Sequence, residues 1–84
     1  MKILHIIRDP REQLALEVAR YQADSREVSL LLIQDGVLAD LMLDLPVYAL
    51  TDDMEARGIQ GRYLLVSYPE VVRLIFEHDK VIIW

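Results

Sequence analysis

The residues of this 84-residue chain best suited to chemistry follow its apolar segments. Gln34, Asp35 and Gly36 come directly after the aliphatic run at residues 30–33. A carboxylate at such a place could bind a cation or act as a general base. Neither a histidine nor a second acid lies nearby in the sequence. The pattern therefore favours a structural interpretation, in which Asp35 caps a helix and Gly36 permits a tight turn.

Two other polar positions could carry catalysis. Asp52 and Asp53 are adjacent, so on a helix they diverge by about 100° and are expected to compensate the helix dipole instead of forming a converging acid pair. Ser67 would need a base to become a nucleophile. His5 lies within an apolar segment, where it is expected to pack or to bond to the backbone. A small hydrolase built on Ser67 and His5 is the least favoured function.

The composition excludes several classes of chemistry. The 84 residues contain no cysteine, which removes disulfides, thiolate metal sites, cysteine nucleophiles and persulfide carriage. The segment "IRDPRE" after the first apolar run has no glycine, so it is neither a P-loop nor a dinucleotide fingerprint. The net charge is −5 and the nine basic residues are scattered, which argues against direct nucleic-acid binding. We expect no cofactor and no metal.

Strands and helices must position these residues, and the sequence patterns typical of strands and of helices alternate along the chain. Short aliphatic segments typical of buried parallel strands occupy residues 2–7, 27–33, 46–50, 62–67 and 80–84. Strands separated by helices predict a mainly parallel sheet of about five strands in a flavodoxin-like, three-layer α/β/α sandwich. The pattern leaves the strand order open. The whole chain, 1–84, is expected to form a single domain.

The first helix has a predicted start and a predicted inner side. Asp9 is the expected N-cap, Pro10 the first helical residue and Glu12 the capping-box partner. Leu16 falls on the outer side and is a candidate contact residue. The inner stripe is expected to comprise Leu14, Ala15, Val18, Ala19 and Tyr21.

Three further helices are expected. Thr51 is the predicted N-cap of one that stops at Gly58, and Pro69 opens the last. A short helix after Gly36 is predicted from the helical spacing of Val37, Leu38, Leu41, Met42 and Leu45. The side chains predicted to point inward from the last helix are Val71, Val72, Ile75 and Phe76.

The hydrophobic fraction is 54%, which is more apolar material than so small a core needs. Oligomerisation is the usual way to bury such a surplus. No apolar run approaches the ~18 residues that span a bilayer, and the first residues lack the pattern of a signal peptide. We expect a cytoplasmic protein.

Four segments together resemble the DsrH/TusB family of sulfur-relay proteins: "ILHII", "LLLIQDGVLA", "VYALTDDMEARGI" and "VVRLIFEHDKVIIW". They cover nearly the whole chain in the expected order. The resemblance implies α/β/α subunits that assemble with Cys-bearing DsrE/TusD-type and DsrF/TusC-type subunits. Such complexes pass persulfide sulfur toward 2-thiolation of the wobble uridine of tRNA, or serve dissimilatory sulfur metabolism.

The chain departs from this family pattern in one respect. Some DsrH-like proteins carry a cysteine in the first helix, where this sequence has Arg20. A thiolate is the persulfide carrier, so the resemblance implies a non-catalytic subunit. The candidate partner-contact residues are Asp9, Leu16, Gln34, Asp35, Gly36, Arg57 and Trp84. Trp84 could fold back on its own domain or enter a subunit interface.

A second function stays open at this point. The chain could be a stand-alone homo-oligomeric module that binds a small ligand through loops at the carboxyl ends of its strands, where such folds bind ligands. Those loops carry Asp9, Gln34 and Asp35.

Overall fold

A computed structural model describes residues 1–61 and 63–84, and its centre is one sheet of five parallel strands. The strands are β1 (Lys2–Ile7), β2 (Glu27–Leu32), β3 (Val47–Leu50), β4 (Leu64–Val66) and β5 (Lys80–Ile83). The helices of the described residues are α1 (Gln13–Gln22), α2 (Thr51–Ala56), α3 (Tyr68–Glu77) and the 3₁₀ helix η1 (Gln34–Leu38). The predicted α/β class with a parallel, flavodoxin-like sheet is confirmed. The fourth strand was predicted to begin at Arg62, which lies outside the described residues.

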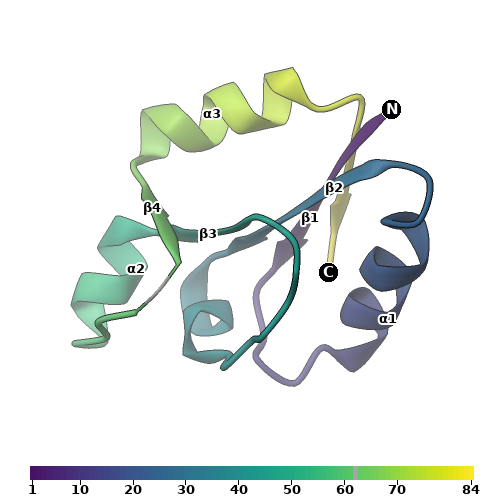
Figure 1. Cartoon of the computed structure of the whole chain (residues 1–84). Coiled ribbons are helices and arrows are strands. Elements are labelled where there is room, and N and C mark those ends of the chain that lie inside the picture. Colours follow the sequence, from purple (N-terminus) through teal and green to yellow (C-terminus); the bar gives the residue numbers. More distant parts are fainter. Residues whose placement is uncertain (62) are drawn as a thin grey trace.

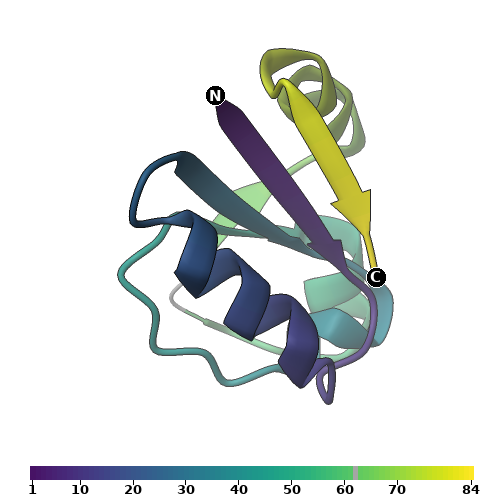
Figure 2. The same ribbon diagram turned by 90° about the vertical axis from the view of Figure 1, so that its right-hand side faces the viewer.

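The strand order is β4-β3-β2-β1-β5. The chain steps from β1 to β4 in one direction, and α3 then carries it back across the sheet to β5 beside β1 (Figure 1). Figure 2 shows α1 and α3 on opposite faces of the sheet. Val37 of η1 and Met54 of α2 pack in the same core cluster as α1, so these three helices cover one face, whereas the other carries α3.

Alternation along β1 divides the core between the two faces. Ile3 and Ile7 belong to the larger cluster, together with Ala15 and Ala19 of α1. Leu4 and Ile6 belong to the smaller cluster, with Leu74 of α3. The central strands β1, β2 and β3 are thus largely buried on both sides, as their aliphatic sequences predicted, whereas the edge strands β4 and β5 are more exposed.

The predicted start of the first helix is wrong. Helix α1 begins at Gln13, its N-cap is Glu12, and no side chain caps it. Asp9 instead accepts hydrogen bonds from the backbone and side chain of Arg11 at 2.8 and 3.1 Å. The Asp9 carboxylate therefore closes a local loop with Arg11, and the residues expected in the first turn precede the helix.

The predicted inner side of α1 is also partly wrong. Leu16, expected outside, is buried beside Ala15 and Ala19, whereas Leu14 and Tyr21 are exposed. Small alanine side chains let the helix approach the sheet closely, and Leu16 fills the space beside them. Leu16 is therefore a core residue in this structure and lies away from the surface on which it was expected.

The helix predicted through Leu45 is replaced by η1 and an extended segment. Ala39 ends η1 with ψ of 136°, and the burial of the side chains that follow alternates. Leu41, Leu43 and Leu45 pack on the larger cluster, which is the core on the α1 side of the sheet, while Met42 is exposed. The hydroxyl of Tyr63 donates to the carbonyl of Ala39 and accepts the backbone N–H of Leu41 at 2.9 Å. These bonds satisfy backbone groups of the extended segment.

The last two helices follow the expected boundaries more closely. Gly58 has φ of 62° just after α2, which confirms it as the helix stop, while Thr51 is the first helical residue and not the N-cap. Helix α3 begins with a capping box that Ser67 and Glu70 form reciprocally. The capping box explains why α3 starts so sharply after the short strand β4.

The predicted inward side of α3 is partly wrong. Leu74 is its buried residue and Val71 is half-buried. The other three side chains predicted to point inward, Val72, Ile75 and Phe76, are exposed.

No helix in the described part of the chain is long and apolar enough to cross a membrane.

Candidate partner-contact site

The polar residues singled out in the sequence lie at the carboxyl edge of the sheet. Because all five strands are parallel, the segments after β1, β2 and β3 leave the sheet at this edge, and Trp84 follows β5 there. The turn at Gln34–Leu38 packs against both β3 and α2. We call Gln34, Asp35, Asp53 and Arg57 the turn cluster.

Arg57 is the centre of the turn cluster. Its Nε and Nη2 bond to Oδ1 of Asp35 at 3.1 and 2.9 Å, and its Nη1 lies 3.4 Å from Oδ1 of Asp53. The backbone N–H of Gln34 donates to Oδ2 of Asp53 at 2.6 Å. The same side chains therefore fix the turn after β2 to helix α2. Asp35 was predicted to cap a helix, but η1 has no side-chain cap and Asp35 pairs with Arg57 instead.

The turn has one residue with an unusual backbone conformation and one position with no room for a side chain. Gln34 has φ of 51°, and the N–H that this conformation presents is the one that Asp53 accepts. A Cβ on Gly36 would lie 2.2 Å from the carbonyl oxygen of Ile7. Ile7 also accepts the N–H of Ile33 at 3.1 Å. Gly36 is thus required by the close approach of the turn to the end of β1, which agrees with the predicted tight turn.

Asp9 lies on the neighbouring loop and forms an exposed ion pair with Arg11 at 2.9 Å. Hydrogen bonds from the Arg11 side chain and backbone lower the pKa of Asp9 from 3.8 to about 2. Arg8, the residue before it, donates from Nε to the backbone oxygen of Trp84 at 3.2 Å. The loop after β1 is therefore linked to the end of β5.

Trp84 packs on its own domain. Its ring stacks near His5 with centroids 6.0 Å apart, and the side chain contacts the core on the α1 side. Its Nε1 donates to Nδ1 of His5 at 2.9 Å, and Nε2 of His5 lies 2.6 Å from Oε1 of Gln22. The side chain of His5 is completely buried. Of the two placements left open for Trp84, the structure shows the intradomain one.

These contacts limit the chemistry available at this edge. Asp35 and Asp53 are both engaged by Arg57, and both ring nitrogens of His5 have partners. The hydroxyl of Ser67 donates to Glu70 at 2.9 Å, inside the capping box. The arrangement does not join Ser67 to His5. The carboxyl edge instead presents charged loops that hydrogen bonds and ion pairs fix to neighbouring elements.

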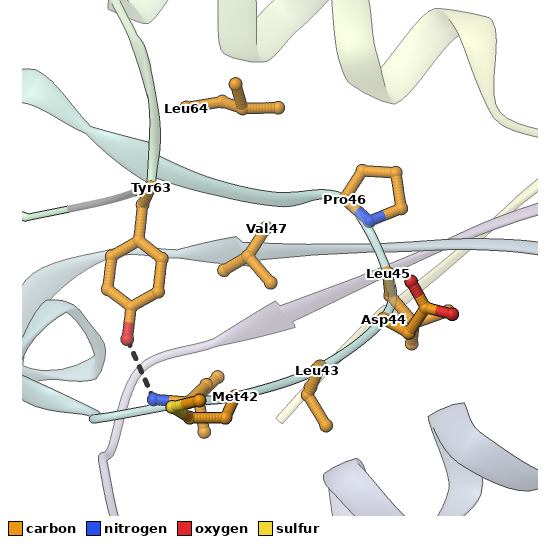
Figure 3. A pocket seen from close by; sticks show the side chains of 9 residues that line it. Met42, Leu43, Asp44, Leu45, Pro46, Val47, Tyr63 and Leu64 are labelled. Atoms are coloured by element: carbon orange, nitrogen blue, oxygen red, sulfur yellow. Dashed lines mark hydrogen bonds between the residues drawn. The ribbon is translucent and has the colours of Figure 1, made fainter.

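Sequence patterns did not point to Gln22 or Tyr63. Gln22 lies at the end of α1, and only the folded chain brings it to His5. Tyr63 precedes β4 and borders a hollow of about 680 Å³ with residues 41–47 and Leu64 (Figure 3). The hollow lies at the amino ends of β3 and β4, opposite the turn cluster, where a helix had been predicted.

Comparisons with known proteins agree on one family. Residues 9–81 match the family described as DsrH like protein. Protein TusB of Serratia proteamaculans (strain 568) is 39% identical over 69 residues, which cover 66% of this chain and 73% of the relative. Protein TusB of Escherichia coli (strain K12) is 36% identical over the same shares of the two chains. Protein TusB of Enterobacter sp. (strain 638) is 38% identical over those shares.

Proposed function

We propose that this chain, which belongs to the DsrH family, is a subunit of a DsrEFH/TusBCD-type sulfur-relay complex. The complex supports persulfide sulfur transfer in the cytoplasm, for 2-thiolation of the tRNA wobble uridine or for related dissimilatory sulfur metabolism. The partners are Cys-bearing DsrE/TusD-type and DsrF/TusC-type subunits. The family match over residues 9–81 is the observation that carries this proposal.

The role of the chain in the relay is non-catalytic. Persulfide sulfur travels on thiolates, and the 84 residues contain no cysteine. His5 and Ser67, the other groups considered for catalysis, are both engaged in structural hydrogen bonds. The chain therefore completes and shapes the complex, while the partners carry the sulfur.

The turn cluster and the loop of Asp9 are the proposed recognition surface at the carboxyl edge. Asp35 remains 66% exposed at its side chain although Arg57 binds it, so a partner can still reach the carboxylate. Arg57 is more buried, since only 28% of its side chain is exposed, and it holds the loop in one position. A fixed loop loses less conformational entropy on binding than a mobile one, which suits a surface that receives a partner's persulfide loop.

Reconstitution with ³⁵S tests this function. The chain is mixed with the Cys-bearing TusD-type and TusC-type proteins of its own genome, and a persulfide donor labelled with ³⁵S is added. We expect label on the Cys-bearing subunits, none on this chain, and faster transfer to the next acceptor when this chain is present. Label on this chain, or a transfer rate independent of it, contradicts the proposal.

A genetic measurement distinguishes the two pathways. Deletion of the gene is followed by mass spectrometry of tRNA nucleosides. Loss of 2-thiouridine derivatives, restored by the wild-type gene, assigns the chain to tRNA thiolation. Unchanged tRNA together with impaired oxidation or reduction of inorganic sulfur assigns it to dissimilatory metabolism. If neither changes, the sulfur-relay function is wrong.

A further inference from the structure

Helix α3 carries an apolar stripe that its own sheet does not cover. The stripe consists of Tyr68, Val72, Ile75 and Phe76, which we call the α3 stripe. Phe76, the one phenylalanine in the sequence, is 84% exposed. The spacing of these residues, i, i+4, i+7 and i+8, places them along one side of the helix. An uncovered stripe of this kind is unusual, because large apolar side chains normally face a core.

The apolar part of α3 is wider than one contact surface requires. At about 100° per residue, its apolar side chains span an arc of about 200°. Val71 and Leu74 occupy the part that packs on the sheet, and the α3 stripe occupies the adjoining part. A helix that covers one side of a sheet needs an apolar arc of about 100°. The remainder of the arc is suited to a second packing surface.

The sheet adds exposed leucine and isoleucine to the same face. Leu64 is paired with Tyr48, and Ile83 is paired with Ile6; both of these partners pack in the α3-side core. In parallel strands, paired residues point to the same face, so Leu64 and Ile83 also point to the α3 side. Figure 3 shows Leu64 and its neighbour Tyr63 pointing to opposite sides of the sheet.

The α3 stripe is a large exposed apolar patch for a chain of this size, and a partner helix beside α3 would add the contacts of its own flanks to it. If a fully exposed large side chain offers about 200 Å², the α3 stripe alone exposes on the order of 500 Å². Leu64 and Ile83 lie on the opposite edge strands β4 and β5, so they add separate apolar area to this face. The largest apolar patch of a typical monomer is roughly 300–600 Å², and a standard interface takes about 800 Å² from each partner. The other face of the sheet carries α1, η1 and α2, whereas this face has α3 (Figures 1 and 2). One more helix beside α3 would complete the layer.

We infer that the α3 face binds an amphipathic helix of a Cys-bearing partner subunit, which lies alongside α3 on the α3 stripe. This inference rests on the proposed function and names the surface through which the complex forms. A second copy of this chain is the less suitable occupant for two reasons. It would bring the same net charge of −5, and it would add no thiolate to the relay.

Two matched pairs of substitutions test the surface. Phe76 and Tyr21 are each the penultimate residue of a ten-residue helix, on opposite faces of the sheet, and are 84% and 80% exposed. Val72 of α3 and Leu14 of α1 are 52% and 56% exposed. Each residue is replaced by Asp in the full chain, giving Phe76→Asp against Tyr21→Asp and Val72→Asp against Leu14→Asp. The circular dichroism spectrum and melting temperature of each variant confirm folding.

Binding to the co-expressed TusD-type and TusC-type proteins of the same genome is measured by co-purification and calorimetry. We expect Phe76→Asp and Val72→Asp to weaken binding by about 30-fold or more, the effect of a central interface residue. Tyr21→Asp and Leu14→Asp should change it by less than about threefold. Hydrogen exchange of wild-type α3 should slow in the complex. This last measurement does not depend on any variant folding.

The outcomes separate this inference from the proposed function. If the wild-type chain binds none of these proteins, the proposed function fails, and the partner surface fails with it. If the wild-type chain binds but Phe76→Asp and Val72→Asp bind equally well, only the α3 surface is wrong. A chain that forms a homodimer dispersed by Phe76→Asp, without binding those proteins, assigns the α3 stripe to a second copy and overturns the partner proposed here.

Discussion

The indole Nε1–H of Trp84 donates a hydrogen bond to Nδ1 of His5, 2.9 Å away, across 79 positions of sequence. Indole nitrogen can only donate, so Nδ1 of His5 must be the acceptor and the ring proton must lie on Nε2. That Nε2–H then donates to Gln22 at 2.6 Å. The folded chain thereby selects one neutral tautomer of a completely buried histidine.

Replacing Trp84 by Phe tests this relationship. The substitution keeps an aromatic ring but leaves the buried Nδ1 of His5 without its donor, which should lower the free energy of unfolding by about 1–3 kcal/mol. Urea denaturation followed by circular dichroism measures the loss, because Trp84 is the one tryptophan and its fluorescence is lost with it. In a His5→Leu background the same substitution should cost much less. Equal losses in both backgrounds would contradict the hydrogen bond.

The turn cluster predicts coupling between Asp35 and Arg57. Either Asp35→Ala or Arg57→Ala removes the ion pair at the start of η1, and we expect each to lower stability by about 0.5–1 kcal/mol. The two effects should add incompletely in the double variant, because the Asp35–Arg57 pair is lost in both, while Arg57→Ala also removes the contacts to Asp53. Asp52→Ala, in the same helix as Asp53, is the control for loss of a carboxylate. Strict additivity in thermal unfolding would show that the pair contributes nothing to stability.

Gly36→Ala should be strongly destabilising. The new Cβ would lie 2.2 Å from the carbonyl oxygen of Ile7, so the turn must move away from β1 and weaken the bond that Ile33 makes to the same oxygen. We expect a loss of about 1–3 kcal/mol, measured by urea denaturation. Gly61→Ala is the matched control, because its Cβ would meet the flexible end of Met54 at 3.3 Å. Similar losses for both variants would rule out the close approach at Gly36.

Asp9 should titrate at unusually low pH. Arg11 lowers its pKa from 3.8 to about 2, so the contact contributes stability above pH 3.8 that disappears as the pH falls toward 2. Carbon-detected NMR of the carboxyl group measures this pKa directly. Arg11→Ala should return the value to its ordinary range, while Arg26→Ala should leave it unchanged. A pKa near 3.8 in the wild-type chain would mean that the ion pair is not formed in solution.

The capping box of α3 makes a second pH-dependent prediction. Hydrogen bonds from the backbone and side chain of Ser67 lower the pKa of Glu70 below 4.5, so the cap is intact above that pH and is lost on acidification. Ser67→Ala removes the hydroxyl that accepts the N–H of Glu70. The pKa of Glu70 should then rise toward its ordinary value, and the melting temperature at neutral pH should fall. A pKa unaffected by Ser67→Ala would contradict the capping box.

The fold class and the positions of the strands could be predicted from sequence because local patterns report them. Five aliphatic segments separated by helical patterns require a parallel sheet, and β1 was placed at its observed bounds, Lys2–Ile7. The DsrH resemblance likewise depends on the order of short motifs along the chain. Such features need no knowledge of which segments meet.

The segment after Gly36 shows where local patterns become ambiguous. Leu38, Leu41 and Leu45 fit a helical spacing, but Leu41, Leu43 and Leu45 also fit the alternation of an extended chain. The hydroxyl of Tyr63, which bonds to Ala39 and Leu41, supports the extended alternative. A contact between segments separated by more than twenty residues cannot be read from either periodicity.

Helix α3 shows the same limit for the direction a helix faces. Its sequence marks an apolar arc, and the prediction placed the middle of that arc on the sheet. In the structure Leu74 faces the sheet and Phe76 faces outward. An arc wide enough for two contact surfaces does not say which part meets the chain's own sheet.

The sequence by itself determined the parallel α/β class and the absence of a thiolate from these 84 residues, because local periodicity and composition carry that information. The order of its short motifs determined the family by resemblance. Only the tertiary structure decided the strand order, the pairing of Asp35 with Arg57, the bond from Trp84 to His5 and the outward direction of Phe76. Each of these depends on which distant segments come into contact. Packing selects those contacts from the whole chain at once, whereas a sequence pattern describes one segment at a time.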